Sequence, residues 1–306
     1  MYIKTIALIG ATGLIGSHLS KYLNKKGYLL KIFGGNIEKS KKIIPFADEY
    51  YQWNYKNPDT LAINLDGADI VIHLAGANVF AKRWTEKFKK EIYDSRIDST
   101  RNVVEAFKKL NKKPELFICS SGSNYYGSRG NEPLTESSSA GNDFMANVCK
   151  GWEAEASKAE ALGIRRVSVR TSVVFSKKGS ALDQITLPYK LFVGGPLANG
   201  KQFMPWVHIE DFESIINFII ENKNITGAVN AGAPENITMN VMAKEFGKAL
   251  HRPSFFRVPK FVLKIVLGEY ADVITGSQRI IPKKLLDNDF IFNYSILESA
   301  LNDLLK

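Results

Sequence analysis

The sequence predicts an α/β fold in which a doubly wound parallel sheet carries a smaller carboxyl-terminal lobe. Two observations support this prediction. Apolar runs suited to buried strands alternate with helical segments over the first 175 residues, as in βαβ units. From residue 176 the chain becomes irregular and rich in glycine and proline. We therefore expect a sheet domain over residues 1–175, joined again by a helix and strand from about 208–232, and a substrate lobe formed by 176–207 and 233–306.

The first strand is expected at residues 3 to 9, IKTIALI, an apolar run of the kind buried on both faces of a parallel sheet. It leads into GATGLIG, where Gly10, Gly13 and Gly16 form a GxxGxxG pattern at the start of a helix. Such glycines allow a tight turn, close approach of a pyrophosphate and close helix packing, and the free N–H groups of the helix favour phosphate. With a second strand at 28–35, the order of elements predicts a dinucleotide site of the Rossmann kind.

The cofactor should touch the glycine turn and the carboxyl ends of the strands. We expect contacts from Gly10, Thr12, Gly13, Leu14, Ile15, Gly34, Asn36, Leu74, Ala75, Gly76 and Ser120. A site for NAD would carry an acidic residue after the second strand to bind the ribose 2′-OH. The position after the second strand is occupied here by Gly34, Gly35 and Asn36, with Lys39 and other lysines just beyond. The sequence therefore favours NADP, with NAD as the alternative.

The alternation continues through the middle of the chain. We expect strands at 69–76, 116–122 and 165–175, and helices at about 85–111 and 143–162. Because ligands bind at the carboxyl ends of parallel strands, the ends of these strands should face the cofactor. His73 falls inside its strand and is expected to be a core residue.

With these elements assigned, the chain resembles the extended branch of the short-chain dehydrogenase/reductase superfamily. The motifs are GATGLIG, HLAG, SSGSNYYG, RTSVVF and WVHIEDF. More narrowly, it is similar to an atypical epimerase-like subgroup of the NAD-dependent epimerase/dehydratase family with a carboxyl-terminal domain of unknown function. That likeness rests on ANVFAKRW, DFMANVCKGWE and GGPLANGKQFMPWVH, and extends over essentially the whole chain.

The resemblance implies a Tyr-x-x-x-Lys pair on the helix FMANVCKGWEAEA, where tyrosine is the general acid/base and lysine holds the nicotinamide ribose. The alignment sets Val148 in the place of the tyrosine and Trp152 in that of the lysine, uncertain by one residue. Neither side chain exchanges a proton near neutral pH. Trp152 either shields the nicotinamide or belongs to the core. The matching pair Tyr22 and Lys26 lies in the first helix and is interpreted as coincidence.

Other side chains are candidates for proton transfer and substrate binding. Ser121 and Tyr125 are our catalytic candidates, with Ser123 and Tyr126 as rivals. Cys149 and Glu153 are weaker alternatives, because a buried cysteine and a salt-bridged glutamate are the more ordinary roles. Asp211 is expected to be structural, at the start of a helix. The substrate pocket is expected to include Arg83, Trp84 and Trp206, with Arg96 and residues 202–205 as further wall candidates.

Two functions follow from these motifs. The first is an NADP-binding oxidoreductase or epimerase-like enzyme acting on an unknown small polar metabolite. The second is a non-catalytic NADP(H)-binding sensor or regulatory module. The absent Tyr-Lys pair favours the second, whereas a retained substrate lobe favours the first.

Composition excludes several other classes. The net charge of +10 comes mostly from scattered lysine pairs without interleaved aromatic residues, so no nucleic-acid partner is expected. The apolar runs are far shorter than the roughly 20 residues that span a bilayer, and no signal peptide is recognisable. We expect a cytoplasmic protein without membrane contact. The two cysteines, Cys119 and Cys149, form no metal-ligand pattern, so no metal is expected.

Overall fold

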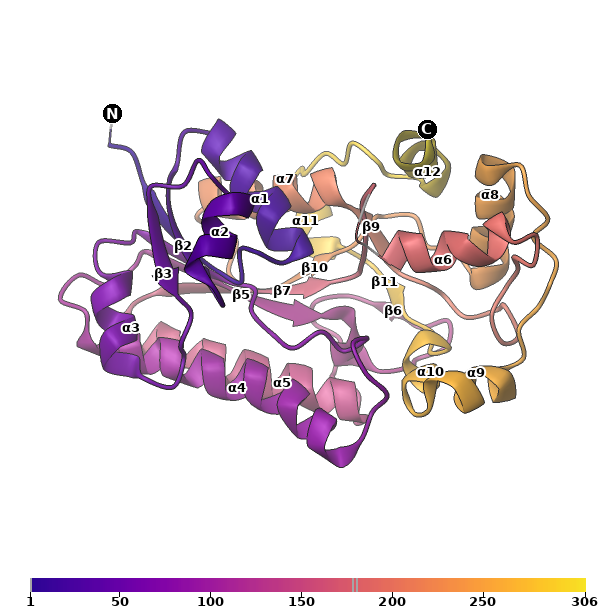
Figure 1. The fold of residues 1–306 in the computed structure, drawn as a ribbon, viewed down its shortest axis with the longest axis horizontal. Coiled ribbons are helices and arrows are strands. Elements are labelled where there is room, and N and C mark those ends of the chain that lie inside the picture. Colours follow the sequence, from indigo (N-terminus) through magenta and orange to yellow (C-terminus); the bar gives the residue numbers. More distant parts are fainter. Residues whose placement is uncertain (1, 178, 180) are drawn as a thin grey trace.

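A computed structural model describes residues 2–177, 179 and 181–306. It consists of a twisted sheet with helices on both faces and, beside it, a lobe built mainly of helices (Figure 1). The strands are β1 (Thr5–Ile9), β2 (Leu29–Gly34), β3 (Glu49–Gln52), β4 (Ile70–His73), β5 (Leu116–Gly122), β6 (Pro133–Leu134), β7 (Arg165–Thr171), β8 (Val173–Phe175), β9 (Trp206–His208), β10 (Gly227–Ala231) and β11 (Arg279–Ile280). The helices are α1 (Leu14–Lys25), α2 (Ile37–Ile43), α3 (Pro58–Leu65), α4 (Glu86–Lys109), α5 (Phe144–Ser157), α6 (Ala181–Lys190), α7 (Ile209–Glu221), α8 (Met239–Leu250), α9 (Lys260–Leu267), α10 (Tyr270–Ile274), α11 (Lys283–Leu286) and α12 (Leu297–Leu305), with 3-10 turns at Ser123–Tyr126 and Lys158–Leu162.

The main sheet has seven strands in the order β10-β7-β5-β4-β1-β2-β3, and every pairing in it is parallel. The expected doubly wound Rossmann sheet is therefore confirmed. The strand order reverses beside β1, which pairs with β2 on one side and β4 on the other. Such a reversal leaves a crevice at the carboxyl ends of the strands, which is where ligands bind in open α/β sheets.

Alternate side chains of the strands supply two cores, one on each face of the sheet. The first core packs Ile6 and Leu8 of β1 against α1 and α7. The second packs Ala7 and Ile9 against α3, α4 and α5. Figure 1 shows the same division, with α1 and α7 on one side of the sheet and α4 and α5 on the other. Because both faces are covered, β1 reads as a continuous apolar run.

The lobe has its own core, in which α6, α8 and α12 pack around Phe175 and Trp206. Two short parallel pairs connect it to the sheet domain, β8 with β9 and β6 with β11. Helices α9 and α10 complete the lobe on the side nearer to α4 and α5 (Figure 1).

The structure refines several expected boundaries. The strand expected at 165–175 divides into β7 and β8, because Ser172 turns the chain out of the main sheet and its N–H pairs with Ala231 O. The helix expected at 143–162 is α-helical to Ser157 and ends in a 3-10 turn. Strand β3 and helix α3 were not anticipated. Strand β3, EYYQ, lies at the edge of the sheet, is only partly buried, and therefore lacks an apolar run.

Candidate functional site

The turn between β1 and α1 requires glycine at two positions. Gly10 has φ +84°, and a Cβ there would lie 2.7 Å from Ala75 N. A Cβ at Gly16 would lie 2.4 Å from Gly10 O. Gly10 thus lets β1 meet the segment after β4, and Gly16 lets α1 pack onto the turn.

Gly13 differs from these two, because its backbone is unstrained. It is the N-cap of α1 with φ −73°, and no side chain caps the helix. A Cβ at Gly13 would meet only Gly10 O, at 3.4 Å, among the described residues. The residue is exposed, so the N-terminal N–H groups of α1 are open to an anion. Thr12, Leu14 and Ile15 are partly buried around this opening.

The end of β2 holds the next group of expected cofactor residues. A Cβ at Gly34 would lie 2.1 Å from Ser40 Oγ, so the packing of α2 requires a residue without a side chain there. Asn36 is exposed and caps α2, accepting a hydrogen bond from Lys39 N at 2.8 Å. The first carboxylate, Glu38, pairs with Lys41. Lys39 is exposed and has no ion pair within the described part of the chain.

Arg96 lies next to the end of β4. A Cβ at Gly76 would be 3.0 Å from Arg96 Cζ, and this guanidinium also lies 5.2 Å from the ring centre of Trp152. Its Nη1 donates to Ile92 O at 3.2 Å, and no carboxylate pairs with it among the described residues. Burial lowers its pKa, yet arginine keeps its charge near neutral pH. The sequence suggested a pocket wall for Arg96, whereas the structure brings it to the expected cofactor edge.

Helix α5 presents a different face to the sheet from the one expected. Val148 is fully buried with Trp84 and Ile92 in a small core between α4 and α5. Trp152 is buried in the core beneath the sheet, and its Nε1 has no hydrogen-bond partner among the described residues. The residues one position later, Cys149 and Glu153, are those that reach the end of β5.

The contacts of these two residues establish that register. Cys149 Sγ lies 3.7 Å from where a Cβ of Gly122 would be, and burial raises the pKa of this thiol to about 11. It is therefore a neutral thiol rather than a nucleophile near pH 7. Glu153 Oε1 accepts a hydrogen bond from Ser121 Oγ at 2.7 Å. The structure thus brings Cys149 and Glu153, rather than Val148 and Trp152, to the end of β5.

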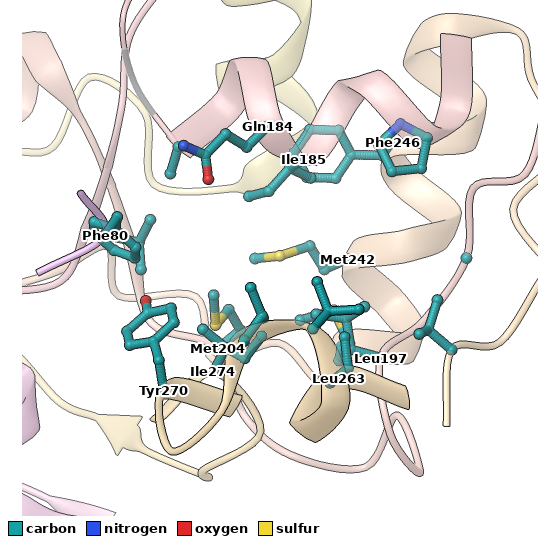
Figure 2. Close-up of a pocket in the computed structure, with 18 of the residues that line it drawn as sticks. Phe80, Gln184, Ile185, Leu197, Met204, Met242, Phe246, Leu263, Tyr270 and Ile274 are labelled. Atoms are coloured by element: carbon teal, nitrogen blue, oxygen red, sulfur yellow. The ribbon is translucent and has the colours of Figure 1, made fainter. Parts of the chain in front are cut away.

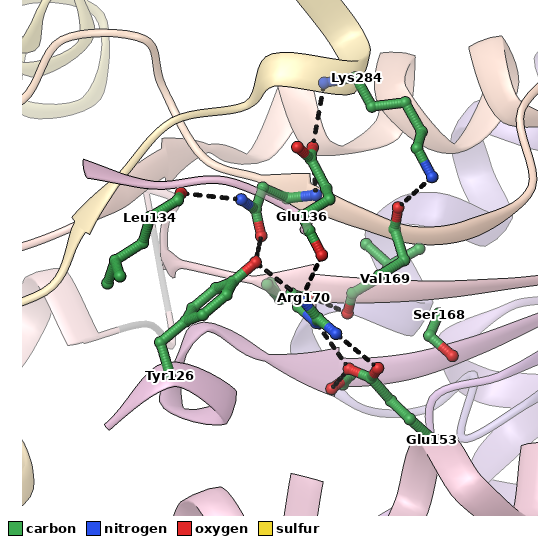
Figure 3. A network of polar contacts seen from close by, with 12 residues as sticks. Tyr126, Leu134, Glu136, Glu153, Ser168, Val169, Arg170 and Lys284 are labelled. Carbon is green, nitrogen blue, oxygen red and sulfur yellow. Dashed lines mark hydrogen bonds and ion pairs between the residues drawn. The ribbon is translucent and has the colours of Figure 1, made fainter. Parts of the chain in front are cut away.

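A buried polar network extends from Glu153 through Arg170 and Glu136 to Lys284 in the carboxyl-terminal segment (Figure 3). Arg170 donates to both oxygens of Glu153, at 2.8 and 2.9 Å, and to Tyr126 Oη at 2.8 Å. Tyr126 in turn donates to Asn230 Oδ1 at 2.7 Å. The network provides hydrogen-bond partners for the Arg170 guanidinium, which is only 4% exposed. Tyr126 belongs to this network and therefore has a structural role.

Tyr125 lies on the other side of the same guanidinium. Its ring centre is 3.4 Å from Arg170 Cζ, a cation–π contact. Its hydroxyl forms no hydrogen bond to any described residue and remains available. Ser123 is buried, and Ser120 points to the opposite sheet face from Ser121 because strand side chains alternate.

A cavity of about 500 Å³ opens in the lobe, within the usual range of ligand pockets. Arg83 lines it, as expected, and so does Met204. Trp84 instead faces a separate, smaller cavity, and its Nε1 donates to Val79 O at 3.0 Å. Trp206 does not line the cavity, because its side chain is fully buried and stacks against Phe175.

Most of the cavity wall comes from residues that sequence patterns did not indicate. The principal side chains are Phe80, Ile185, Leu197, Met242, Phe246, Leu263, Tyr270 and Ile274. Phe80 and Leu197 lie in loops, and the others lie on helices, where their spacing is typical of ordinary core residues. These cavity-lining residues differ from ordinary core residues only because α6, α8, α9 and α10 pack around a gap.

Four other residues have structural surroundings. His73 is fully buried, pairs with Ser99 Oγ at 3.0 Å, and has a pKa lowered to about 3 by burial. Asp211 accepts hydrogen bonds from Asn293 N and Tyr294 N. Tyr22 and Lys26 form a cation–π pair on α1, in a helix that packs on the face opposite α5. In the described chain no cluster of metal-ligating side chains occurs, and no helix has the length and apolarity to cross a membrane.

Comparison with known proteins extends this description. The family model for the NAD dependent epimerase/dehydratase family matches residues 6–232, and a domain of unknown function, DUF1731, matches 258–304. The epimerase family protein YfhF of Bacillus subtilis is 36% identical over 98% of this chain and 97% of its own. The mouse epimerase family protein SDR39U1 is 32% identical over 96% and 97%.

Solved structures show the same relationship. The human epimerase family protein SDR39U1, solved with NADPH, is 29% identical, has a TM-score of 0.87 and covers 98% of both chains. A UDP-glucuronic acid 4-epimerase from Bacillus cereus, solved with UDP-glucuronic acid and NAD, covers 98% of both with a TM-score of 0.77. At 19% identity that likeness concerns the fold alone. The chain described here belongs to the NAD-dependent epimerase/dehydratase family.

Proposed function

We propose that this protein is an NADP(H)-dependent oxidoreductase or epimerase-like enzyme whose cofactor lies along the carboxyl edge of β1, β2 and β4. The observation that carries the proposal is the uncapped, exposed N-terminus of α1 behind Gly10 and Gly13. The NADPH held by the human relative supports the same cofactor here. The bound cofactor would donate or accept a hydride at its nicotinamide ring.

The residues of this chain fit such a cofactor along its length. N–H groups of the α1 start bind the pyrophosphate, because they have no intrahelical partner. Asn36 and Lys39 face the adenosine ribose, where no carboxylate opposes a 2′-phosphate. This supports a preference for NADP over NAD.

Arg96 takes the place of the missing lysine. The one lysine within α5, Lys150, is exposed and lies off the face that Cys149 and Glu153 present to β5. Arg96 offers an unpaired guanidinium beside Gly76 instead. We assign it the binding of the nicotinamide half of the cofactor, which needs a hydrogen-bond donor there.

Tyr125 and Ser121 remain the candidates for contact with the reacting atoms. The Ser121 hydroxyl donates a hydrogen bond to Glu153, but its oxygen can still accept a hydrogen bond from a substrate hydroxyl. Tyr125 keeps a hydroxyl without a hydrogen-bond partner among the described residues, and its ring is held in place over the Arg170 guanidinium. Tyr125 is therefore the proton donor that we favour.

The experiment that tests this function is NADPH oxidation, followed at 340 nm against a panel of aldehydes and ketones. We expect turnover with the wild type and none with Gly13→Val. The panel includes polar sugars and apolar carbonyl compounds, so that substrate class does not bias the result. Binding of NADPH without oxidation in any arm would contradict the oxidoreductase proposal.

The second candidate is an NADP(H)-binding sensor without turnover. The closed network of Ser121, Glu153 and Arg170 favours it, because those polar groups already satisfy one another. A sensor would bind NADPH and change its resistance to proteolysis without consuming the cofactor. An oxidoreductase would consume it with at least one carbonyl compound.

A further inference from the structure

The cavity in the lobe is apolar, which bears on the class of substrate. Its lining includes Val79, Phe80, Val173, Ile185, Leu197, Met204, Met239, Met242, Phe246, Val258, Leu263 and Ile274. Two charged side chains reach it, Lys82 and Arg83, both in the segment after β4. Lys82 already pairs with Glu91 at 3.3 Å. A sugar nucleotide would leave most of its phosphate and hydroxyl groups without partners here, at a cost of about 1–3 kcal/mol for each buried group.

The polar atoms of the cavity gather at one end. Figure 2 shows the Tyr270 hydroxyl and the Gln184 amide directed into the cavity near Phe80, with Met242 and Leu263 farther along it. Phe80 belongs to the segment after β4, so this end faces the sheet domain. The Tyr270 ring packs edge-on to Phe80, with ring centres 4.9 Å apart.

Tyr270 can donate a hydrogen bond to a ligand. Its hydroxyl has no hydrogen-bond partner in the described part of the chain, and burial raises its pKa. It therefore stays protonated at neutral pH. Replacing its hydroxyl while keeping the ring would leave the contact with Phe80 in place.

The cavity reaches the surface through apolar residues. Val193 and Val266 line it, and they are 51% and 66% exposed. These residues expose part of the apolar wall to solvent. The side of α9 that lines the cavity carries Leu263 and no charged residue. A molecule with a long apolar body can therefore enter along this wall.

We propose that the lobe binds a lipophilic substrate with an oxygen-bearing end, which Tyr270 and Gln184 hold toward the cofactor edge while the hydrocarbon body fills the space around Met242. The proposal rests on the proposed function, because it assigns the substrate class of the same site. It replaces the small polar metabolite expected from the sequence.

The test is titration with cis-parinaric acid, a fluorescent fatty acid whose emission rises in an apolar pocket. We expect saturable one-to-one binding to the wild type and no displacement by UDP-glucose. Met242→Trp should weaken binding at least about tenfold, because the added volume occupies the cavity. Val241→Trp, one residue earlier on α8 and outside the lining, is the matched control and should bind as the wild type does.

Two further variants keep the test decisive. Ile185→Trp fills the cavity from α6 and replaces Met242→Trp if that variant fails to fold. Tyr270→Phe should weaken binding several-fold without changing the unfolding temperature. Parinaric acid binding that is equal in all cavity variants, or displacement by UDP-glucose, would overturn the proposal.

NADPH binding, measured on the same proteins, separates this proposal from the proposed function. The cavity variants should bind NADPH as the wild type does. If NADPH does not bind but parinaric acid responds to Met242→Trp, the cofactor assignment alone fails. If NADPH binds and the cavity variants bind parinaric acid as the wild type does, only the proposed substrate class is wrong.

Discussion

The Glu153 carboxylate joins Ser121 to Arg170: Oε1 accepts from Ser121 Oγ at 2.7 Å and from Arg170 Nε at 2.8 Å. One side chain of α5 thereby fixes the ends of two neighbouring strands, β5 and β7. The contact also links α5 to the carboxyl ends of these strands.

Glu153→Ala should be strongly destabilising, because it leaves the buried Arg170 guanidinium without its counter-ion. We expect a loss of about 3 kcal/mol in the free energy of unfolding by urea. Glu155→Ala is the control on the same helix, since its partners Arg101 and Lys158 are about half exposed. It should lose about 1 kcal/mol or less, and equal losses in the two variants would contradict the assigned role of the network.

Tyr125→Phe should separate catalysis from stability. The ring stays over Arg170, so the free energy of unfolding should change little, while kcat falls at least about tenfold with the loss of a proton donor. Tyr126→Phe is the converse control, because it removes hydrogen bonds to Arg170 and Asn230. It should lower stability by about 1 kcal/mol. A Tyr125→Phe enzyme with unchanged kcat would exclude Tyr125 as the donor.

Asn36→Asp should shift the cofactor preference toward NADH. Aspartate also caps a helix, so α2 keeps its N-cap, while the new carboxylate repels a 2′-phosphate. We expect the Kd for NADPH to rise about tenfold, which is ~1.4 kcal/mol, and that for NADH to stay the same or fall. Asn57→Asp makes the same change at the N-cap of α3 and should alter neither the Kd for NADPH nor that for NADH. Equal weakening of both cofactors by Asn36→Asp would argue against a phosphate at this position.

Glu213 on α7 should make stability depend on pH. Burial, with a contribution from Glu210, raises its pKa from 4.5 to about 7. Between these values the unfolded chain has lost the proton that the folded chain keeps, so the contribution of Glu213 to stability falls as pH rises from about 4.5 to 7. His18, 3.7 Å away, and the buried His73 contribute with the opposite sign, because burial lowers the pKa of each and the unfolded chain binds their protons more readily below about pH 6.5.

Glu213→Gln should therefore remove this contribution from the pH profile. Relative to the wild type, the variant should gain about 3 kcal/mol between pH 4.5 and pH 8 in urea unfolding. Glu210→Gln, on the exposed side of the same helix turn, should leave most of the slope in place. A difference between wild type and Glu213→Gln that stays constant across this interval would contradict the raised pKa.

Local patterns were enough to predict the sheet domain. The glycine turn at Gly10 and the apolar run of β1 depend on neighbours in sequence, and both occur as expected. Strand β5 begins and ends at the predicted residues, Leu116 and Gly122. Such features are determined by hydrophobic period and by glycine geometry, which a single sequence displays.

The site required contacts that sequence does not display. The side of α5 that meets Ser121 is set by how α4 packs against it, so Glu153 and Cys149 could not be separated from Trp152 and Val148. Trp206 looked like a pocket residue because it lies in an irregular segment, but stacking on Phe175 places it in the lobe core. The cavity around Met242 depends on the volume left between helices.

The most direct test of the cofactor site is calorimetric titration of NADPH into the wild type and Gly13→Val. The backbone of Gly13 is unstrained and a Cβ there meets no side chain among the described residues, so the variant should fold and keep its unfolding temperature. Its branched side chain would project over the N–H groups of α1. We predict one bound NADPH per wild-type chain and at least about a hundredfold weaker binding, ~2.7 kcal/mol, to a folded Gly13→Val. An unchanged affinity in the folded variant would contradict the placement of the pyrophosphate at this turn.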